Sequence, residues 1–170
     1  LDQRSEKQQT TALVSMSVNL PKEFKGTHMS RFVEVLNEHR GEVTMRTLPM
    51  LLRDLKTRLQ AESAHVELTF PYFIEKAAPV SGARAMMDYQ CAFVAEANGG
   101  EMEFLVQVIV PVTTLCPCSK AISDYGAHNQ RGRVDVQVRP SHDEDGRPAF
   151  IWIEELVALA EASASAPVFP

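Results

Sequence analysis

The fold is decided by the stretch ARAMMDYQCAFVAEANGGEMEFLVQVIV, residues 83–110. Apolar or small residues occupy alternate positions on each side of Asn98-Gly99-Gly100. Alternation with a period of two is typical of half-buried strands, and an Asn-Gly-Gly sequence favours a tight turn. We therefore predict an antiparallel hairpin. Its apolar face contains Ala83, Ala85, Met87, Tyr89, Cys91 and Phe93 before the turn, and Met102, Phe104, Val106, Val108 and Val110 after it.

The residues before the hairpin predict a strand, two helices and an extended segment. Alternation over 11–20 predicts a strand that ends at Pro21. Thr27 is a candidate N-cap for a helix that stops at Gly41. The expected apolar face of that helix contains Met29, Phe32, Val33 and Leu36. A leucine stripe predicts a second helix over 48–59, and residues 65–74 are expected to be extended. The stripe consists of Leu48, Leu51, Leu52, Leu55 and Leu59.

After the hairpin, residues 113–132 show neither the alternation of a strand nor the period of a helix and are expected to be irregular. Residues 133–139 alternate as a strand, 143–146 predict a turn, and 151–162 predict a last helix. This order favours an α+β fold with helices packed on one face of an antiparallel sheet. We expect residues 1–170 to form a single domain of a longer chain whose N-terminal and C-terminal segments are missing here.

Composition excludes several classes of protein. The 170 residues are 45% apolar and 23% charged, which is typical of a globular domain. Seventeen basic against twenty-two acidic residues give a net charge of −5, so a broad nucleic-acid footprint is not expected. The apolar runs are too short for a membrane span. Three cysteines, an odd number, are not the pattern of a protein held together by disulfides. They favour a reducing compartment, which we expect to be the cytoplasm.

The irregular segment contains the residue types of a metal site. Cys116-Pro117-Cys118 precedes Asp124 and His128, and a catalytic site needs about three protein ligands and an open position for water. The Cys-Pro-Cys spacing equally fits buried structural thiols or a redox pair. By contrast, Cys91 lies on the apolar face of the hairpin and is expected in the core.

Charge around this segment suggests an anionic small ligand. Residues 113–139 contain four basic and two acidic side chains within an acidic chain. The start of the helix after Gly26-Thr27-His28 offers backbone N–H groups to an anion, with Arg31 one turn later. Solvated surface residues are the alternative for both features. The remaining histidines, His39, His65 and His142, are expected to be surface or structural residues.

Three motifs together resemble a known family. They are FKGTHMSRF at 24–32, CPCSK at 116–120 and ISDYGAHNQR at 122–131. They are similar to the prokaryotic GTP cyclohydrolase IB family from residue 11 onward. The resemblance implies a tunnelling fold (T-fold) whose sheets join into an oligomeric barrel, in a homotetramer with active sites at subunit interfaces. It also implies metal-dependent hydrolysis of GTP to 7,8-dihydroneopterin triphosphate and formate, the first step of folate and pterin biosynthesis.

The resemblance also assigns roles to residues. Cys116 and His128 would be the catalytic metal ligands, with Cys118 close by, and the metal would be manganese, zinc or ferrous iron. Candidates for binding triphosphate or ribose are His28, Arg31, Ser119, Lys120, Ser123, Gln130 and Arg131.

Two departures from the family pattern affect this assignment. Many members have a glutamate ligand in a Ser-x-Glu context, where this chain has Ser165-Ala166-Pro167. Water, Cys118 or Glu161 would then complete the metal shell. The glutamate that holds the guanine edge is expected beyond residue 170.

Two other functions stay open at this point. The first is a nitrile reductase of the same fold, which acts on a deazapurine through a catalytic cysteine and a nicotinamide cofactor. The second is a non-catalytic metal-binding or thiol-binding oligomer.

Overall fold

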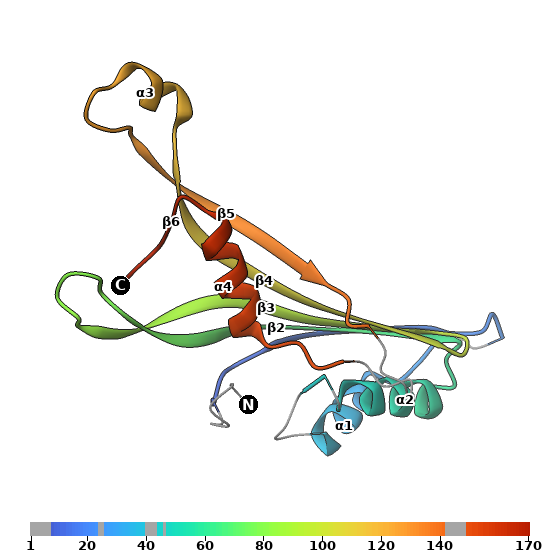
Figure 1. Ribbon diagram of the computed structural model, residues 1–170. Helices are drawn as coiled ribbons and strands as arrows, with labels where there is room; N and C mark the ends of the chain where they lie inside the picture. The colour runs from blue at the N-terminus through green and yellow to red at the C-terminus, as the bar shows by residue number, and fades with distance from the viewer. Residues whose placement is uncertain (1–7, 24–25, 40–43, 46, 142–148) are drawn as a thin grey trace.

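The computed structural model describes residues 8–23, 26–39, 44–45, 47–141 and 149–170. Within them, six antiparallel strands form one sheet in the order β1-β2-β3-β4-β5, with β6 beside β4 (Figure 1). Helices α1, α2 and α4 pack on one face of this sheet, so the predicted α+β class is confirmed. The strands are β1 Leu13–Asn19, β2 Ser63–Ala77, β3 Arg84–Asn98, β4 Glu101–Leu115, β5 Asn129–Val138 and β6 Ala166–Pro167. The helices are α1 Met29–Glu38, α2 Leu48–Leu59, α3 Pro117–Ile122 and α4 Ile153–Ser163.

The predicted hairpin is confirmed. Asn98 pairs with Glu101, so Gly99 and Gly100 form a two-residue turn between β3 and β4. Gly99 has a φ of +58°, a backbone angle that residues other than glycine rarely adopt. Tyr89 and Cys91 on β3 and Val108 on β4 are fully buried, so the alternation corresponds to one buried face in the middle of the hairpin. Ala83 and Ala85, at the start of the predicted face, are exposed, and Ala83 lies before β3.

This turn allows a simple test of its geometry. Gly99→Ala should lower the free energy of unfolding by about 1 kcal/mol, because a Cβ is strained at positive φ. Gly100→Ala is the matched control, since Gly100 lacks a positive φ and has no heavy atom within 4 Å of an added Cβ. Urea denaturation of the two variants measures the difference. Equal stability of both variants would contradict the turn geometry.

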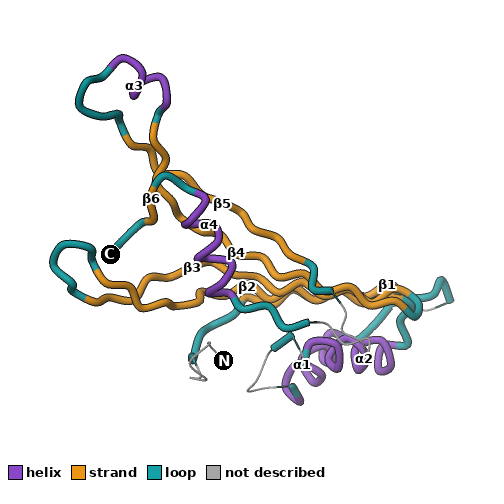
Figure 2. Tube along the Cα trace, in the orientation of Figure 1, coloured by secondary structure: helices purple, strands orange, loops and turns teal. Residues whose placement is uncertain are grey.

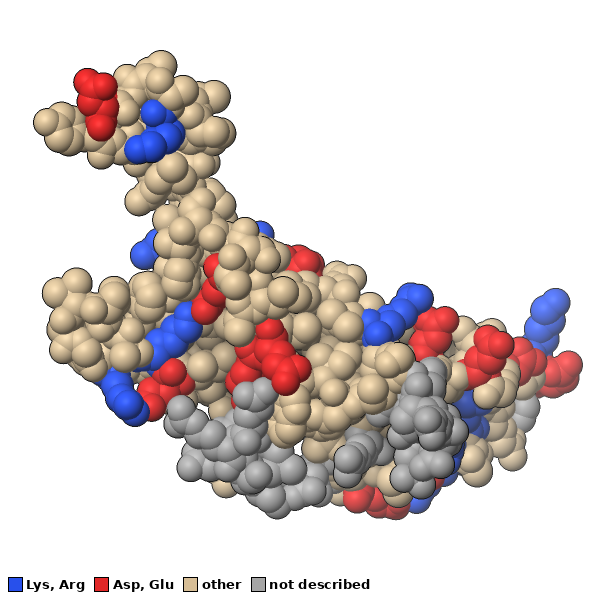
Figure 3. Space-filling view, viewed as in Figure 1, with Lys and Arg blue, Asp and Glu red and all other residues tan. Residues whose placement is uncertain are grey.

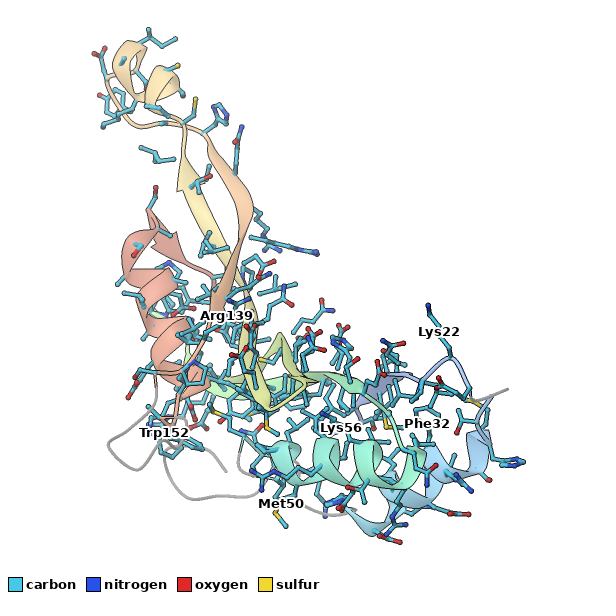
Figure 4. All side chains as sticks on the ribbon, turned by 90° about the vertical axis from the view of Figure 1, so that its right-hand side faces the viewer. Lys22, Phe32, Met50, Lys56, Arg139 and Trp152 are labelled. Carbon is cyan, nitrogen blue, oxygen red and sulfur yellow. The ribbon has the colours of Figure 1, made fainter. Side chains whose placement is uncertain are left out.

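The predicted leucine face of α2 is confirmed, whereas the predicted apolar face of α1 is only partly buried. All five leucines of the α2 stripe are buried, while Met50 points away from the sheet (Figure 4). In α1, the buried residues are Phe32 and Val35, while the side chains of Met29 and Val33 are 73% and 56% exposed. Only a narrow stripe of α1 meets its neighbours, so two apolar residues of the predicted face remain in solvent.

The ends of α1 also differ from the prediction. The N-cap is His28 rather than Thr27, and it makes no side-chain capping hydrogen bond. The helix ends at Glu38, and the predicted stop at Gly41 lies outside the described residues. His39 Nε2 lies 2.7 Å from Asp54 Oδ2, which joins α1 to α2 and confirms a structural role. His65 is half-buried on β2, and His142 and the turn at 143–146 lie outside the described residues.

The last helix is confirmed, with a start two residues later than predicted. Trp152 is its N-cap, and its buried residues are Ile153, Leu156, Val157 and Ala160. These residues belong to one core with the buried faces of α1, α2 and the sheet. Among the described residues, no helix combines the length and apolar character that a membrane span requires.

The prediction for 113–139 was wrong in its boundaries. Strand β4 continues to Leu115, a short helix follows, and β5 begins at Asn129 instead of residue 133. The ends of both strands are exposed and rich in Thr, Gln and Arg, although their backbones pair from Leu115–Asn129 onward. An exposed ribbon shows no apolar alternation, so the periodicity that reveals half-buried strands is missing here.

Candidate active site

The ends of β4 and β5 form an arm, residues 110–134, that projects from the rest of the sheet (Figure 2). Strand β3 pairs with β4 only as far as Gln90–Ile109, whereas β4 and β5 pair as far as Leu115–Asn129. Helix α3 forms the tip of this arm. The visible surface of the arm carries few charges (Figure 3). The CPCSK and ISDYGAHNQR motifs therefore lie together on an exposed projection.

Pro117 determines where α3 begins. A residue before proline avoids the helical region, and Cys116 has extended backbone angles of φ −77° and ψ 114°. Proline is well suited to the first helical position because the missing N–H needs no partner there. The carbonyl of Cys116 accepts a hydrogen bond from the Lys120 N–H at 3.0 Å. Cys116 is therefore held at the boundary between β4 and α3.

The structure brings Cys116 and His128 to the two ends of the loop at the tip. The Cys116 N–H donates to the carbonyl of His128 at 3.3 Å, so their backbones are adjacent. The Ser119 hydroxyl accepts the N–H of His128 at 3.2 Å, and Gln130 Nε2 lies 3.3 Å from His128 Nε2. Cys116 is half-buried and Cys118 is exposed, and neither forms a disulfide. A cysteine and a histidine are thus neighbours where the loop begins and ends.

Within the described part of the chain, no cluster of three or more His, Cys, Asp or Glu residues is present. A metal bound by Cys116 and His128 would therefore need further ligands. Glu161, a predicted alternative, lies on α4 against the sheet, and its carboxylate binds Lys76 and Tyr89. Pro167 pairs with Val112 on β4, so the segment that departs from the family pattern lies at the base of the arm.

The predicted serines stabilise the loop. The Ser123 hydroxyl accepts the N–H groups of Tyr125 and Gly126, at 3.3 and 3.2 Å, as the Ser119 hydroxyl does for His128. Each hydroxyl hydrogen is still available to a ligand, because a hydroxyl donates as well as accepts. Ser119 and Ser123 therefore combine a structural role with the capacity to bind an anion.

The basic residues of 113–139 fall into two groups. Lys120, Arg131 and Arg133 are exposed, and among the described residues they have no carboxylate within 4.0 Å. Arg139 lies at the other end of β5, where its Nη2 is 3.4 Å from Glu103 Oε2. Only the first group is available to an anion beside the loop.

The start of α1 is not brought to the arm within one chain. His28 is the exposed N-cap of α1, and Arg31 Nη1 donates to the carbonyl of Arg58 at 3.3 Å. Figure 1 places α1 at the opposite end of the molecule from α3.

Ser165, which the sequence indicates only as part of the segment that departs from the family pattern, contacts the arm. Its hydroxyl accepts the N–H of Leu115 at 3.0 Å, immediately before Cys116. The contact joins residues 50 positions apart, so no local signal in the sequence indicates it.

Comparison with known proteins supports the family resemblance that the three motifs indicate. The family model described as type I GTP cyclohydrolase folE2 matches residues 1–170. Proteins named GTP cyclohydrolase FolE2 from Syntrophus aciditrophicus and Nitrosococcus oceani are 53% and 51% identical to this chain. These matches cover 99% of this chain and 64% and 60% of the relatives. A third, from Magnetococcus marinus, is 54% identical over 95% of this chain and 58% of its own length.

The chain thus spans about 60% of the length of these relatives. The match to the family model covers every residue, and the similarity includes all three motifs. FolE2 proteins are the type IB family, so the resemblance in the sequence is confirmed. The chain belongs to the type I GTP cyclohydrolase folE2 family.

Proposed function

We propose that the protein containing this chain hydrolyses GTP to 7,8-dihydroneopterin triphosphate and formate with the help of a divalent metal. The relatives named GTP cyclohydrolase FolE2 support the reaction. The observation that carries the proposal is the adjacency of Cys116 and His128 across the loop of the arm. These two residues have the chemistry to bind the metal, and exposed cations lie on the same arm.

The metal would be held by the Cys116 thiolate and the His128 imidazole, which suit zinc and ferrous iron as well as manganese in a mixed shell. When bound, such a cation lowers the pKa of water and supplies hydroxide at neutral pH, the nucleophile that opening the purine ring requires. Gln130 orients the His128 ring through the contact between their Nε2 atoms. Cys118 is available as a further ligand, because its side chain is exposed.

The remaining residues of the arm would hold the triphosphate and the ribose. Phosphate oxygens prefer charged donors, and Lys120 and Arg131 supply them next to Ser119 and Ser123. His28 and Arg31 complete this set only if they come from a second copy of the chain, because α1 lies far from the arm in a single chain.

This arrangement supports a T-fold tetramer with active sites at subunit interfaces. Strands β1 and β5 lie at the two ends of the sheet order, where sheets of neighbouring subunits could pair into a barrel. The arm also exposes Leu115, Ile122 and Tyr125, which are apolar or aromatic side chains suited to an interface. We propose the cytoplasm as the location, because the three cysteines are unpaired.

The test is an anaerobic assay of the full-length protein with GTP and manganese, zinc or ferrous iron in turn. Formate release and the fluorescence of the oxidised pterin report the reaction. We expect both products in equal amounts with at least one metal. Absence of formate with all three metals, or oxidation of NADPH in the presence of a deazapurine nitrile, would reject the proposal.

Lys120→Ala tests the binding of the triphosphate. Loss of one charged contact should raise the KM for GTP about tenfold while kcat stays near the wild-type value. This split is expected because Lys120 would bind phosphate equally in the ground state and the transition state. Lys22→Ala is the matched control, because Lys22 is an exposed lysine far from the arm (Figure 4). Unchanged kinetics of Lys120→Ala would exclude Lys120 from the site.

A further inference from the structure

The base of the arm has a third strand. Beyond Ile109, β4 no longer pairs with β3, so β4 and β5 would continue as a two-stranded ribbon. Two-stranded ribbons are only marginally stable in water. Strand β6 occupies the edge that β3 leaves, because Ala166 pairs with Thr113 and Pro167 with Val112. The Ser165 hydroxyl adds a bond to the N–H of Leu115. The segment 165–167 therefore supports the arm directly before Cys116.

Helix α4 delivers this segment to the arm, and two tyrosines attach α4 to the sheet. Tyr72 and Tyr89 are cross-strand partners on β2 and β3. Tyr72 donates its hydroxyl to Glu154 Oε1 at 2.6 Å, and Tyr89 donates to Glu161 Oε1 at 3.2 Å. The two glutamates are seven residues apart, so they lie on one face of the helix, two turns from each other. These bonds fix α4 along the sheet up to its last turn.

Lys76 connects the last turn of α4 to the residues after β6. Its Nζ forms an ion pair with Glu161 Oε1, and the side chains are only 13% and 15% exposed. The same Nζ donates to the carbonyl of Val168 at 3.4 Å and lies 5.6 Å from the centre of the Phe169 ring. It also lies 5.9 Å from the centre of the Tyr89 ring. One ammonium group thus holds both sides of the segment that supports the arm.

We propose that Glu161, together with Lys76 and Tyr89, is a positioning residue that fixes β6 on β4 and thereby holds the arm carrying Cys116 and His128. Its meaning for catalysis rests on the function proposed above. Glu161 then acts through the backbone of 164–167 and not as a metal ligand, since its Oε1 binds both Lys76 and Tyr89 and so directs the carboxylate toward the sheet. Burial and the charge of Glu161 raise the pKa of Tyr89 above its ordinary value, so the hydroxyl keeps its proton and remains a donor.

Hydrogen exchange of the metal-free full-length protein tests the positioning role without any activity. In Glu161→Ala and in Ser165→Ala, amide exchange within 112–115 and 129–133 should be about tenfold faster than in the wild type. Exchange in α2 should not change. Glu103→Ala is the matched control, because it removes an exposed ion pair from the far end of β4. Wild-type exchange rates of the arm in both variants, with the fold intact, would overturn the proposal.

Cobalt binding separates a positioning role from a ligand role and from a purely structural one. We expect Co²⁺ affinity to fall about tenfold in Glu161→Ala and to recover largely in Glu161→Gln, whose amide oxygen still accepts hydrogen bonds. A ligand role would instead weaken binding equally in both variants, while the arm of Glu161→Gln stays protected. If folded Glu161→Ala binds Co²⁺ as tightly as the wild type, Glu161 has only a structural role. Both this result and equal weakening in the two variants would reject the proposal. A wild type that binds no Co²⁺ and releases no formate would reject the proposed function, and the exchange rates would still decide whether Glu161 holds the arm.

Discussion

Replacement of either Cys116 or His128 by alanine should reduce formate release from GTP about a hundredfold or more. Even residues that only orient metal ligands cost 10- to 100-fold when they are removed, so loss of a ligand should cost at least as much. Both variants should also bind less metal after dialysis. Metal analysis by mass spectrometry and single-turnover assays with saturating GTP measure the two effects. The overall fold should persist, because His128 is exposed and Cys116 is only half-buried.

Cys91 supplies a matched control for this result, and Cys118 supplies a second test of the ligand set. Cys91→Ala removes a thiol from the buried face of β3 and should keep the wild-type metal content. Cys118→Ala decides whether the second thiol of the Cys-Pro-Cys motif is a ligand, because only a ligand would lower metal content to the level of Cys116→Ala. Full activity and full metal content in Cys116→Ala or His128→Ala would contradict the assignment of that residue.

The parts of the fold that could be predicted are those where periodicity and burial coincide. The leucine stripe of α2 and the alternation along β3 and β4 each describe one buried face, so the pattern predicts the element directly. In α4, Ile153, Leu156, Val157 and Ala160 recur with the helical period and are all buried. Each of these elements is amphipathic with the period of its own secondary structure.

The outer part of the arm could not be predicted because, beyond Val112, its strands bury neither face. Backbone pairing between residues 113–115 and 129–131 leaves no trace in the sequence when most of these side chains remain in solvent. The prediction of the buried face of α1 was partly wrong for a related reason. Met29 and Val33 follow a helical period with Phe32, yet no neighbouring element in the described chain covers them. Apolar residues left exposed in one chain are compatible with the proposed assembly of several copies.

The sequence indicates only those residues of the candidate site that lie close together along the chain. Cys116 and His128 come from one short segment, and the structure places their backbones side by side. The contacts of Glu161 and Ser165 depend on partners tens of residues away, such as Lys76 and Leu115, and were therefore not foreseen. His28 and Arg31 remain a prediction, because their proposed role requires a second copy of the chain.

The buried thiol of Cys91 links stability to alkaline pH. Burial, assisted by the charge of Glu154, raises the pKa of Cys91 to about 12, whereas a cysteine in an unfolded chain has a pKa of about 8.5. The folded state therefore keeps its proton at a pH where the unfolded state has lost it. The stabilisation from this difference is complete below pH 8.5, and it is lost as the pH rises from there toward 12. Because the folded state binds one proton more in this range, the loss is about 1.4 kcal/mol per pH unit.

Cys91→Ala should consequently be less stable than the wild type at pH 8 and more stable at pH 11. At pH 8 the variant loses about 1 kcal/mol of apolar burial. Between pH 8.5 and 11 the wild type alone should lose about 2 to 3 kcal/mol through the unfolded thiolate, which is enough to reverse the order. Urea denaturation of both proteins under reducing conditions at pH 8, 9, 10 and 11 measures the difference, and all other titrating groups cancel because the two chains share them. A constant difference across these four pH values would mean that Cys91 ionises as readily in the folded protein as in the unfolded chain, and that its side chain is reached by solvent.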